Sequence, residues 1–221
     1  MSVFSDTIEG GNFVEVAPSV FQADILSKSD TDKLLSEFEG RQPWDHAKVA
    51  VPTNNSQGVN DIIGILDLDQ RNAFRMRLRD LDMSDKIRTV EYLKHVQNAV
   101  SIFATAEFGM DFNEFGGEEI VRYPLGGLFS PHTDTHKGNS QRAFTVIIYL
   151  NDSYEAGETF FPDLNYTCTP KAGRVLVFMS TELHSGLPVK SGEKYIMVFW
   201  GFFPGSMSKE QLSNYHRQAN I

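Results

Sequence analysis

Three residues able to bind a metal ion stand at alternate positions in the stretch SPHTDTHKG, residues 130–138. They are His132, Asp134 and His136. Alternate side chains of an extended chain project to the same face, so these three groups can point into one site. Imidazole and carboxylate together suit a borderline divalent ion better than Ca²⁺ or Mg²⁺, which prefer oxygen ligands. The stretch therefore predicts a metal site, although the His-x-Asp spacing of His132 and Asp134 is weak evidence by itself.

A second candidate site lies later in the chain, in LHSGLPVKSGEKYIMVFW. His184 follows a buried strand in a polar turn, where a histidine bonded to the backbone is the ordinary explanation. Lys194 opens the next strand and shares a face with Ile196, Val198 and Trp200 if that strand alternates. A lysine on an apolar face needs an anion as its partner. The third metal ligand can thus be His136 or a distant residue such as His184.

The segment before residue 110 has helical patterning. Apolar residues recur at helical spacing over 27–40 and 84–109, and a loop or flexible flap with the sequence VPTNNSQGVND is expected over 51–61. The predicted caps and stops are Ser29 or Asp30 with Gly40 for the first helix, and Ser84 with Gly109 for the second.

The segment after residue 115 consists of short β-rich runs separated by links that contain Gly, Pro, Asn and Asp. The runs are EEIVRY, AFTVIIYL, ETFFP, RVLVFMS, HSGLPV and KYIMVFWGFF. This pattern predicts a mainly β fold with supporting α-helices and a jelly-roll or cupin-like core. We expect one domain over 1–221, with a helical N-terminal support over 1–110, a catalytic core over 111–205 and a C-terminal tail over 206–221. In that tail, SKEQLSNYHRQANI, residues 208–221, is expected to form a last helix.

The composition is that of a globular protein, with 41% hydrophobic and 22% charged residues. The net charge is −9, and the absence of an evident basic run argues against a nucleic-acid partner. The chain has one cysteine, Cys168, and lacks both an apparent secretory signal and an apolar stretch long enough to span a bilayer. We therefore expect a cytoplasmic protein with no membrane partner.

Five sequence blocks in order resemble the catalytic core of the Fe(II)/2-oxoglutarate-dependent dioxygenases, specifically the prolyl 4-hydroxylase-like group. They are YPLGGLFSPHTD, RAFTVIIYLND, AGETFFPDLN, PKAGRVLVF and LHSGLPVKSGEKYIMVFW. The resemblance covers about a third of the chain and implies a double-stranded β-helix core. Five ordered blocks are a far more specific signal than any one of them.

The resemblance assigns roles to individual residues. It implies that His132, Asp134 and His184 bind iron, while His136 is a surface or substrate-side residue. It also implies that Lys194 binds the distal carboxylate of 2-oxoglutarate. Three further residues match the cosubstrate pocket, and two match positions on the substrate side or in the core packing. The first group is Tyr123, Tyr149 and Thr159, and the second is Arg142 and Trp200.

The activity implied is hydroxylation of an aliphatic C–H by Fe(II), 2-oxoglutarate and O₂, with release of succinate and CO₂ and with ascorbate as a candidate reductant of the iron. The substrate is a prolyl or other amino-acid side chain or a small metabolite. Ala156-Gly157 replaces the family's Gly-Gly, and the segment before His184 is short. Two competing hypotheses are a non-catalytic 2-oxoglutarate- or oxygen-sensing module and a cupin-like metal isomerase or hydrolase. Neither of them needs the three implied iron ligands together with Lys194.

Overall fold

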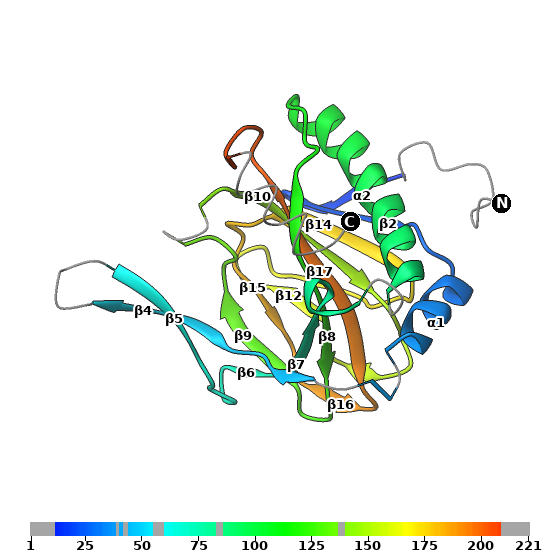
Figure 1. Cartoon of the computed structure of the whole chain (residues 1–221), viewed down its shortest axis with the longest axis vertical. Helices are drawn as coiled ribbons and strands as arrows, with labels where there is room; N and C mark the ends of the chain where they lie inside the picture. The colour runs from blue at the N-terminus through cyan, green and yellow to red at the C-terminus, as the bar shows by residue number, and fades with distance from the viewer. Residues whose placement is uncertain are drawn as a thin grey trace.

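Two antiparallel sheets form the body of the molecule. The structure is a computed structural model that describes residues 12–38, 40–41, 44–54, 60–82, 86–136 and 140–208. The larger sheet has the strand order β1-β2-β14-β10-β17-β8-β7-β3 (Figure 1). Its strands are β1 (Val14–Ala17), β2 (Val20–Asp24), β14 (Arg174–Met179), β10 (Arg142–Tyr149), β17 (Lys194–Phe202), β8 (Phe115–Tyr123), β7 (Phe74–Arg77) and β3 (Asp45–His46).

The smaller sheet has the order β13-β12-β15-β9-β6 and supplies the histidines of the candidate site. Its strands are β13 (Tyr166–Cys168), β12 (Thr159–Phe161), β15 (His184–Gly186), β9 (Leu128–His132) and β6 (Arg71–Asn72). Two further pairs complete the β structure, namely β4 (Val49–Asn54) with β5 (Asn60–Ile65) and β11 (Glu155–Ala156) with β16 (Val189–Ser191). The predicted mainly β fold with a double-stranded β-helix core is confirmed.

The larger sheet is buried on both faces, which explains why its central strands are almost continuously apolar. On β10, Phe144, Val146 and Ile148 belong to the cluster that packs against the helices. Ile147 and Tyr149 belong to a second cluster between the two sheets. Alternation along one strand thus assigns one set of side chains to the helical support and the other to the interior of the jelly roll.

Two helices cover the outer face of the larger sheet, as Figure 1 shows for α2. Helix α1 (Lys28–Ser36) begins with Ser27 as N-cap in a capping box with Asp30, so the predicted N-cap at Ser29 or Asp30 is wrong by two or three residues. It also ends before the predicted stop at Gly40. No helix among the described residues is long and apolar enough to cross a membrane.

Helix α2 (Ile87–Phe108) ends at Gly109, whose φ of 68° is the left-handed conformation expected of a glycine at this position. Lys86 takes the N-cap position, and the predicted cap Ser84 lies outside the described residues. A short 3₁₀ helix, η1 (Leu78–Asp80), follows β7.

The segment before residue 110 is not only a helical support, because several of its strands join the sheets. Strand β2 pairs with β14, and β7 pairs with β8. The flap expected over 51–61 lies within the β4–β5 hairpin, which projects from the body in Figure 1, with 55–59 outside the described residues. The predicted C-terminal helix lies almost wholly outside the described residues, which end at 208.

Candidate active site

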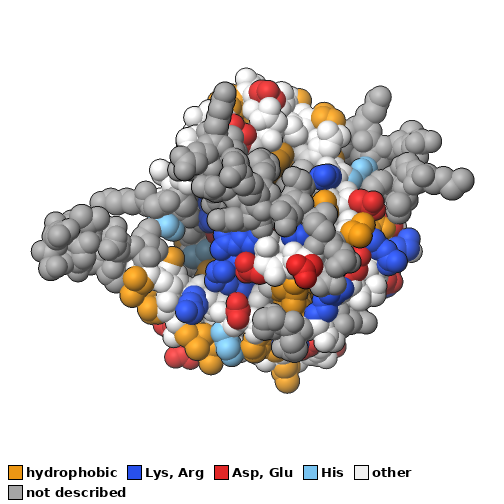
Figure 2. All heavy atoms as spheres, viewed as in Figure 1, with side chains coloured by type: hydrophobic (Ala, Val, Ile, Leu, Met, Phe, Trp, Pro, Cys, Tyr) orange, Lys and Arg blue, Asp and Glu red, His pale blue; other side chains and the backbone are white. Residues whose placement is uncertain are grey.

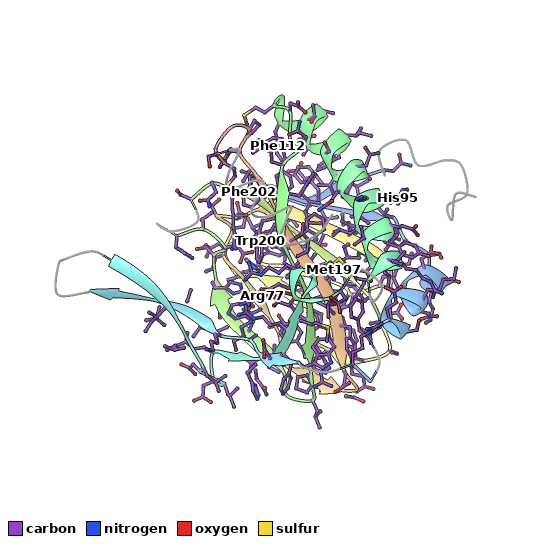
Figure 3. The ribbon with its side chains drawn as sticks, viewed as in Figure 1. Arg77, His95, Phe112, Met197, Trp200 and Phe202 are labelled. Atoms are coloured by element: carbon purple, nitrogen blue, oxygen red, sulfur yellow. The ribbon has the colours of Figure 1, made fainter. Side chains whose placement is uncertain are left out.

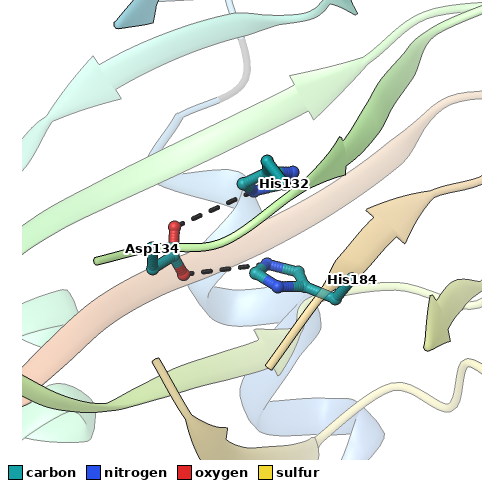
Figure 4. A group of neighbouring side chains, drawn as sticks. All are labelled: His132, Asp134 and His184. Atoms are coloured by element: carbon teal, nitrogen blue, oxygen red, sulfur yellow. Dashed lines mark ion pairs between the residues drawn. The ribbon is translucent and has the colours of Figure 1, made fainter. Parts of the chain in front are cut away.

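His132, Asp134 and His184 come together between the two sheets (Figure 4). His132 ends β9 and His184 begins β15, and the two residues are direct partners across this antiparallel pair. Asp134 lies two residues after His132. Its carboxylate oxygens are 3.8 Å from His132 Nε2 and 3.7 Å from His184 Nε2. The potential ligand atoms of all three residues lie within 4.8 Å of one another.

Both imidazoles are oriented by backbone carbonyls. Nδ1 of His132 lies 2.8 Å from the Ser130 carbonyl oxygen, and Nδ1 of His184 lies 3.0 Å from that of Glu182. A carbonyl oxygen only accepts, so each Nδ1 carries a proton and each ring directs Nε2 toward the site. Burial and the neighbouring His184 ring hold the pKa of His132 far below its ordinary value, which keeps the imidazole neutral.

The Asp134 carboxylate is held from behind by the Thr145 hydroxyl, which in turn contacts the Ser180 hydroxyl. Thr145 Oγ1 donates to Asp134 Oδ2 at 2.6 Å and lies 3.0 Å from Ser180 Oγ. Burial acts to raise the pKa of Asp134, but the two imidazoles and the Thr145 hydrogen bond outweigh it and hold the pKa below the usual range. The site therefore presents an ionised carboxylate beside the neutral imidazole of His132.

This donor set fits a divalent transition metal such as Fe(II). The distances of 3.7 and 3.8 Å between carboxylate oxygens and ring nitrogens are too long for direct hydrogen bonds, and they suit atoms that share a cation between them. Two imidazoles and one carboxylate would hold such an ion and leave it able to bind further ligands. The opposite assignment, with His136 as third ligand, has no support, because His136 lies outside the cluster.

Lys194 lies in the buried part of the same cavity. It opens β17 directly opposite Tyr123 of β8, and it is 3% exposed. Its Nζ donates to the Gly157 carbonyl oxygen at 2.6 Å and lies 5.1 Å from the centre of the Tyr123 ring. Burial lowers the pKa of Lys194 to about 8, because no carboxylate pairs with it among the described residues. An ammonium in these surroundings is a ready partner for an anion.

The other predicted cosubstrate residues surround Lys194. Tyr123 and Thr159 line the cavity, and burial raises the pKa of the Tyr123 hydroxyl. Tyr149 lies behind this wall, with its hydroxyl 2.7 Å from Thr159 Oγ1 and its ring centre 5.6 Å from Lys194 Nζ. The structure thus places Tyr149 where it orients Thr159.

The three weaker substrate-side candidates lie toward the cavity mouth. Arg142 stacks on Trp200, with its guanidinium carbon 3.5 Å from the ring centre, and donates to the Asp134 carbonyl oxygen at 3.2 Å. Trp200 lines the cavity, so it is more than core packing. His136 also lines the cavity but is exposed.

A row of arginines in the cavity wall was missed by the sequence analysis, which found no basic run. Arg71 lies on β6, Arg75 and Arg77 lie on β7, and Arg79 follows in η1; all four line the cavity. The alternation of basic and apolar residues in FRMR, residues 74–77, is the signal that could have found them. The cavity as a whole has a volume of about 540 Å³, which suits small ligands.

Comparison with known proteins identifies the region that carries this site. Residues 119–202 match the family model of the 2OG-Fe(II) oxygenase superfamily. A protein of Acanthamoeba polyphaga mimivirus named as a prolyl 4-hydroxylase is 34% identical over 42% of this chain. The chain spans about half of that relative's length, 48%. A PKHD-type hydroxylase of Prochlorococcus marinus is 24% identical over 80% of this chain and 74% of its own length.

Solved structures show the same fold at lower sequence identity. A prolyl hydroxylase from Trichoplax adhaerens, in complex with a peptide of hypoxia inducible factor, matches with a TM-score of 0.67 at 16% identity over 84% of each chain. A viral collagen prolyl hydroxylase from Paramecium Bursaria Chlorella virus-1, in complex with 2-oxoglutarate, matches with a TM-score of 0.57 at 23% identity over 84% of this chain and 98% of its own. Residues 119–202 of this chain therefore match the 2OG-Fe(II) oxygenase superfamily and are similar to proteins named as prolyl 4-hydroxylases.

Proposed function

We propose that this chain is an Fe(II)- and 2-oxoglutarate-dependent hydroxylase that acts on an aliphatic C–H of a prolyl or other amino-acid side chain or of a small metabolite. The observation that carries the proposal is the convergence of His132, Asp134 and His184 in one cavity with a buried Lys194 that no described carboxylate neutralises. The hydroxylase names of the relatives support the same reaction class. A non-catalytic binding module is not favoured, because all four residues are present.

Each part of the cavity has a task in this reaction. His132, Asp134 and His184 would hold Fe(II), which supplies the chemistry that activates O₂. Lys194 would bind the distal carboxylate of 2-oxoglutarate by a charge-assisted hydrogen bond, and Thr159 would contribute a hydroxyl. The overall reaction converts substrate, O₂ and 2-oxoglutarate into hydroxylated substrate, succinate and CO₂. Ascorbate as reductant and a reducing compartment such as the cytoplasm remain expectations from the sequence.

The test is production of succinate by purified protein supplied with Fe(II), 2-oxoglutarate and O₂, with and without proline-containing peptides. We expect succinate from the wild-type chain and none from Lys194→Met at cosubstrate concentrations that saturate the wild type. Absence of succinate from folded, iron-loaded wild type with every candidate substrate would overturn the proposal. Arg88→Gln, on the outer face of α2 with a side chain that is 59% exposed, is the matched control for loss of a single positive charge.

A further inference from the structure

The cavity wall carries far more positive than negative charge, although the chain as a whole is acidic. Among the described residues, seven Lys or Arg and three Asp or Glu line the cavity. The whole chain, in contrast, has 20 Lys or Arg and 29 Asp or Glu. Lys194 and Asp134 have roles in the proposed function, which leaves six cations facing two acids. Figure 2 shows blue Lys and Arg side chains bordering the hollow to the left of the centre. Lys48 and Arg79 are exposed to solvent, whereas the partly buried arginines of the wall favour an anion as a partner.

Strand register explains why the arginines face the cavity. Arg75 is the partner of Val121, and Arg77 is the partner of Glu119, on the neighbouring strand β8. Their neighbours Phe74 and Met76 point to the opposite face, where Met76 is buried in the core under the helices. Figure 3 labels Arg77 near the middle of the view and His95 on helix α2 at the right.

A single carboxylate serves two of these arginines. Glu119 Oε1 lies 2.9 Å from Arg75 Nη1 and 3.5 Å from Arg77 Nε, with the Glu119 side chain only 11% exposed. Arg75 Nε is buried without a hydrogen-bond partner among the described residues. Burial lowers the pKa of Arg75, and repulsion from Arg77 and Arg71 adds to the effect of burial. Arg77 Nη1 also lies 3.7 Å from the exposed carboxylate of Asp80, so the buried side of the wall holds one acid, Glu119, for two guanidinium groups.

Arg71 extends the positive wall toward the metal site. Its guanidinium carbon lies 4.4 Å from the centre of the Phe129 ring, and that ring stacks on His132 at 3.5 Å between centres. Arg71 Nη1 donates to the Lys48 carbonyl oxygen at 3.3 Å, but its Nε is buried without a partner among the described residues. No described carboxylate forms an ion pair with Arg71. A ring thus separates an uncompensated guanidinium from the candidate metal ligand.

We propose that the substrate of this hydroxylase carries a carboxylate, which Arg71, Arg75 and Arg77 bind at the β6–β7 wall while the carbon to be hydroxylated faces the metal site. The inference rests on the proposed function and narrows its substrate class to acidic peptides or small acids. Guanidinium groups bind carboxylates through paired hydrogen bonds, and partial burial strengthens such bonds. A nucleic-acid ligand is disfavoured, because the net charge of −9 repels an extended polyanion.

The test measures binding of labelled proline-containing peptides to the full chain loaded with Fe(II) and 2-oxoglutarate under argon, where no turnover occurs. Three peptides differ only in whether Glu, Gln or Lys flanks the proline, and fluorescence anisotropy reports the Kd. We expect the Glu peptide to bind at least about tenfold more tightly than the Gln peptide, and the Lys peptide to bind least. Equal binding of the three peptides, or preference for Lys, overturns the inference.

Two substitutions with opposite expected effects separate binding from a structural role. Arg77→Gln keeps the Arg75–Glu119 pair and should weaken binding of the Glu peptide about tenfold. Glu119→Gln removes the buried carboxylate that both arginines share and should strengthen binding of the Glu peptide about threefold. If the row only stabilises the sheet, neither variant shifts the Kd in these directions, although both lower the melting temperature. Arg88→Gln should leave the Kd unchanged.

Competition identifies the source of the carboxylate. Free glutamate that displaces the Glu peptide at comparable concentration indicates a small acid, and failure to displace it indicates a peptide. Failure of both Glu peptide and glutamate to bind overturns the inference. The inference is also overturned if a single-stranded oligonucleotide displaces the labelled Glu peptide at a lower concentration than the unlabelled Glu peptide does. That result would indicate a phosphate ligand.

Binding of 2-oxoglutarate, measured on the same samples, separates this inference from the proposed function. Arg77→Gln should keep the 2-oxoglutarate Kd within about twofold of wild type, whereas Lys194→Met should raise it at least about tenfold. If Arg77→Gln weakens 2-oxoglutarate binding as Lys194→Met does, the row belongs to the cosubstrate and the inference is wrong. If wild type binds 2-oxoglutarate but shows no preference for acids, only the inference fails.

Discussion

At the scale of single residues, the site depends on which side chains touch the three candidate ligands. His132 and His184 donate through Nδ1 to carbonyl oxygens, so their orientation comes from the backbone of two strands. Asp134 depends instead on side chains, since Thr145 donates to one of its oxygens. Substitutions therefore affect the ligands differently, according to what supports each one.

Replacement of His184 and of His136 by alanine tests the ligand assignment. We expect His184→Ala to lose iron and turnover while it remains folded, because an alanine supplies no ligand atom. His136→Ala should retain iron, since His136 lies outside the cluster. Iron content of the purified variants, measured by atomic absorption, checks both expectations. The reverse result, with iron lost only in His136→Ala, would show that the assignment is wrong.

Removal of the Thr145 hydroxyl tests the support of Asp134. Thr145→Val preserves shape but deletes the 2.6 Å hydrogen bond to Asp134 Oδ2. We expect Fe(II) affinity to fall about 10- to 100-fold, as is typical when a residue that orients a metal ligand is lost. Metal titration by calorimetry measures the change, with Thr133→Val as control because the Thr133 hydroxyl donates to the Thr135 carbonyl. Equal affinities of the two variants would contradict the role given to Thr145.

The buried amine of Lys194 predicts a pH dependence of cosubstrate binding. Its pKa of about 8 lies below the ordinary lysine value of 10.5, so the free protein loses the ammonium charge as the pH rises through about 8. A bound dicarboxylate favours the charged form, so binding takes up a proton above that pH. The 2-oxoglutarate affinity should therefore fall by up to about tenfold for each further pH unit.

Calorimetric titration at about pH 7 and about pH 9.5 checks this expectation. Lys194→Arg is the control, because a guanidinium keeps its charge across this range and should flatten the profile. A wild-type affinity that stays constant between the two pH values would show that Lys194 does not pair with the cosubstrate. The Lys194→Arg result also distinguishes the titration of Lys194 from any effect of pH on the metal site.

At the scale of elements, the strands of the core were predictable because each has a consistent pattern. AFTVIIYL and RVLVFMS are long β-branched and aromatic runs, and both form central strands. Strands β2 and β7 were missed because they are short and their pairing partners lie far away in sequence, at β14 and β8. The arginines of β7, Arg75 and Arg77, were missed for the same reason, because the pairing of β7 with β8 determines that they face the cavity.

The contact between β2 and β14 depends on a glycine. Gly173 has a φ of 84°, and a Cβ at this position would lie 1.8 Å from the Leu26 carbonyl oxygen. Its own carbonyl oxygen accepts from the amides of Ile25 and Leu26. We expect Gly173→Ala to lower the free energy of unfolding by about 3 kcal/mol or more, because backbone must move.

Urea unfolding measures this loss. Gly205→Ala is the matched control, with a φ of 70° but open space around the added methyl group. This control should cost only about 1 kcal/mol, the penalty of the left-handed conformation itself. If both variants cost the same, the close approach of Leu26 contributes nothing to stability beyond the backbone conformation.

At the scale of the whole molecule, strands and helices from the N-terminal half pair with and pack against the core strands of the C-terminal half. The outer face of the larger sheet is covered by α1 and α2, and the cluster there includes Ile120, Phe144 and Met197 from the core strands. The family resemblance identified the core and the candidate ligands, since these depend on local blocks. It could not identify the part of the cavity wall that comes from the segment before residue 110, such as Arg71 and Arg77, because the five blocks do not cover that segment.

Removal of the N-terminal half should therefore abolish folding, even though the family model begins at residue 119. A fragment of residues 111–221 would expose the apolar face that the helices cover and would lose β2 and β7 from the sheet. We expect no cooperative thermal transition and weak near-ultraviolet circular dichroism from this fragment. A native-like spectrum with bound iron would show that the core folds alone.

The direct pairing of His132 with His184 across β9 and β15 has a mechanical consequence. An ion bound between the two rings would act as a reversible cross-link between neighbouring strands of the smaller sheet. Any species that binds only the folded chain stabilises it in proportion to the logarithm of its free concentration above the Kd. The lifetime of this protein in a cell would then follow the iron supply. Scarcity of the ion would remove both the catalytic metal and the cross-link between β9 and β15.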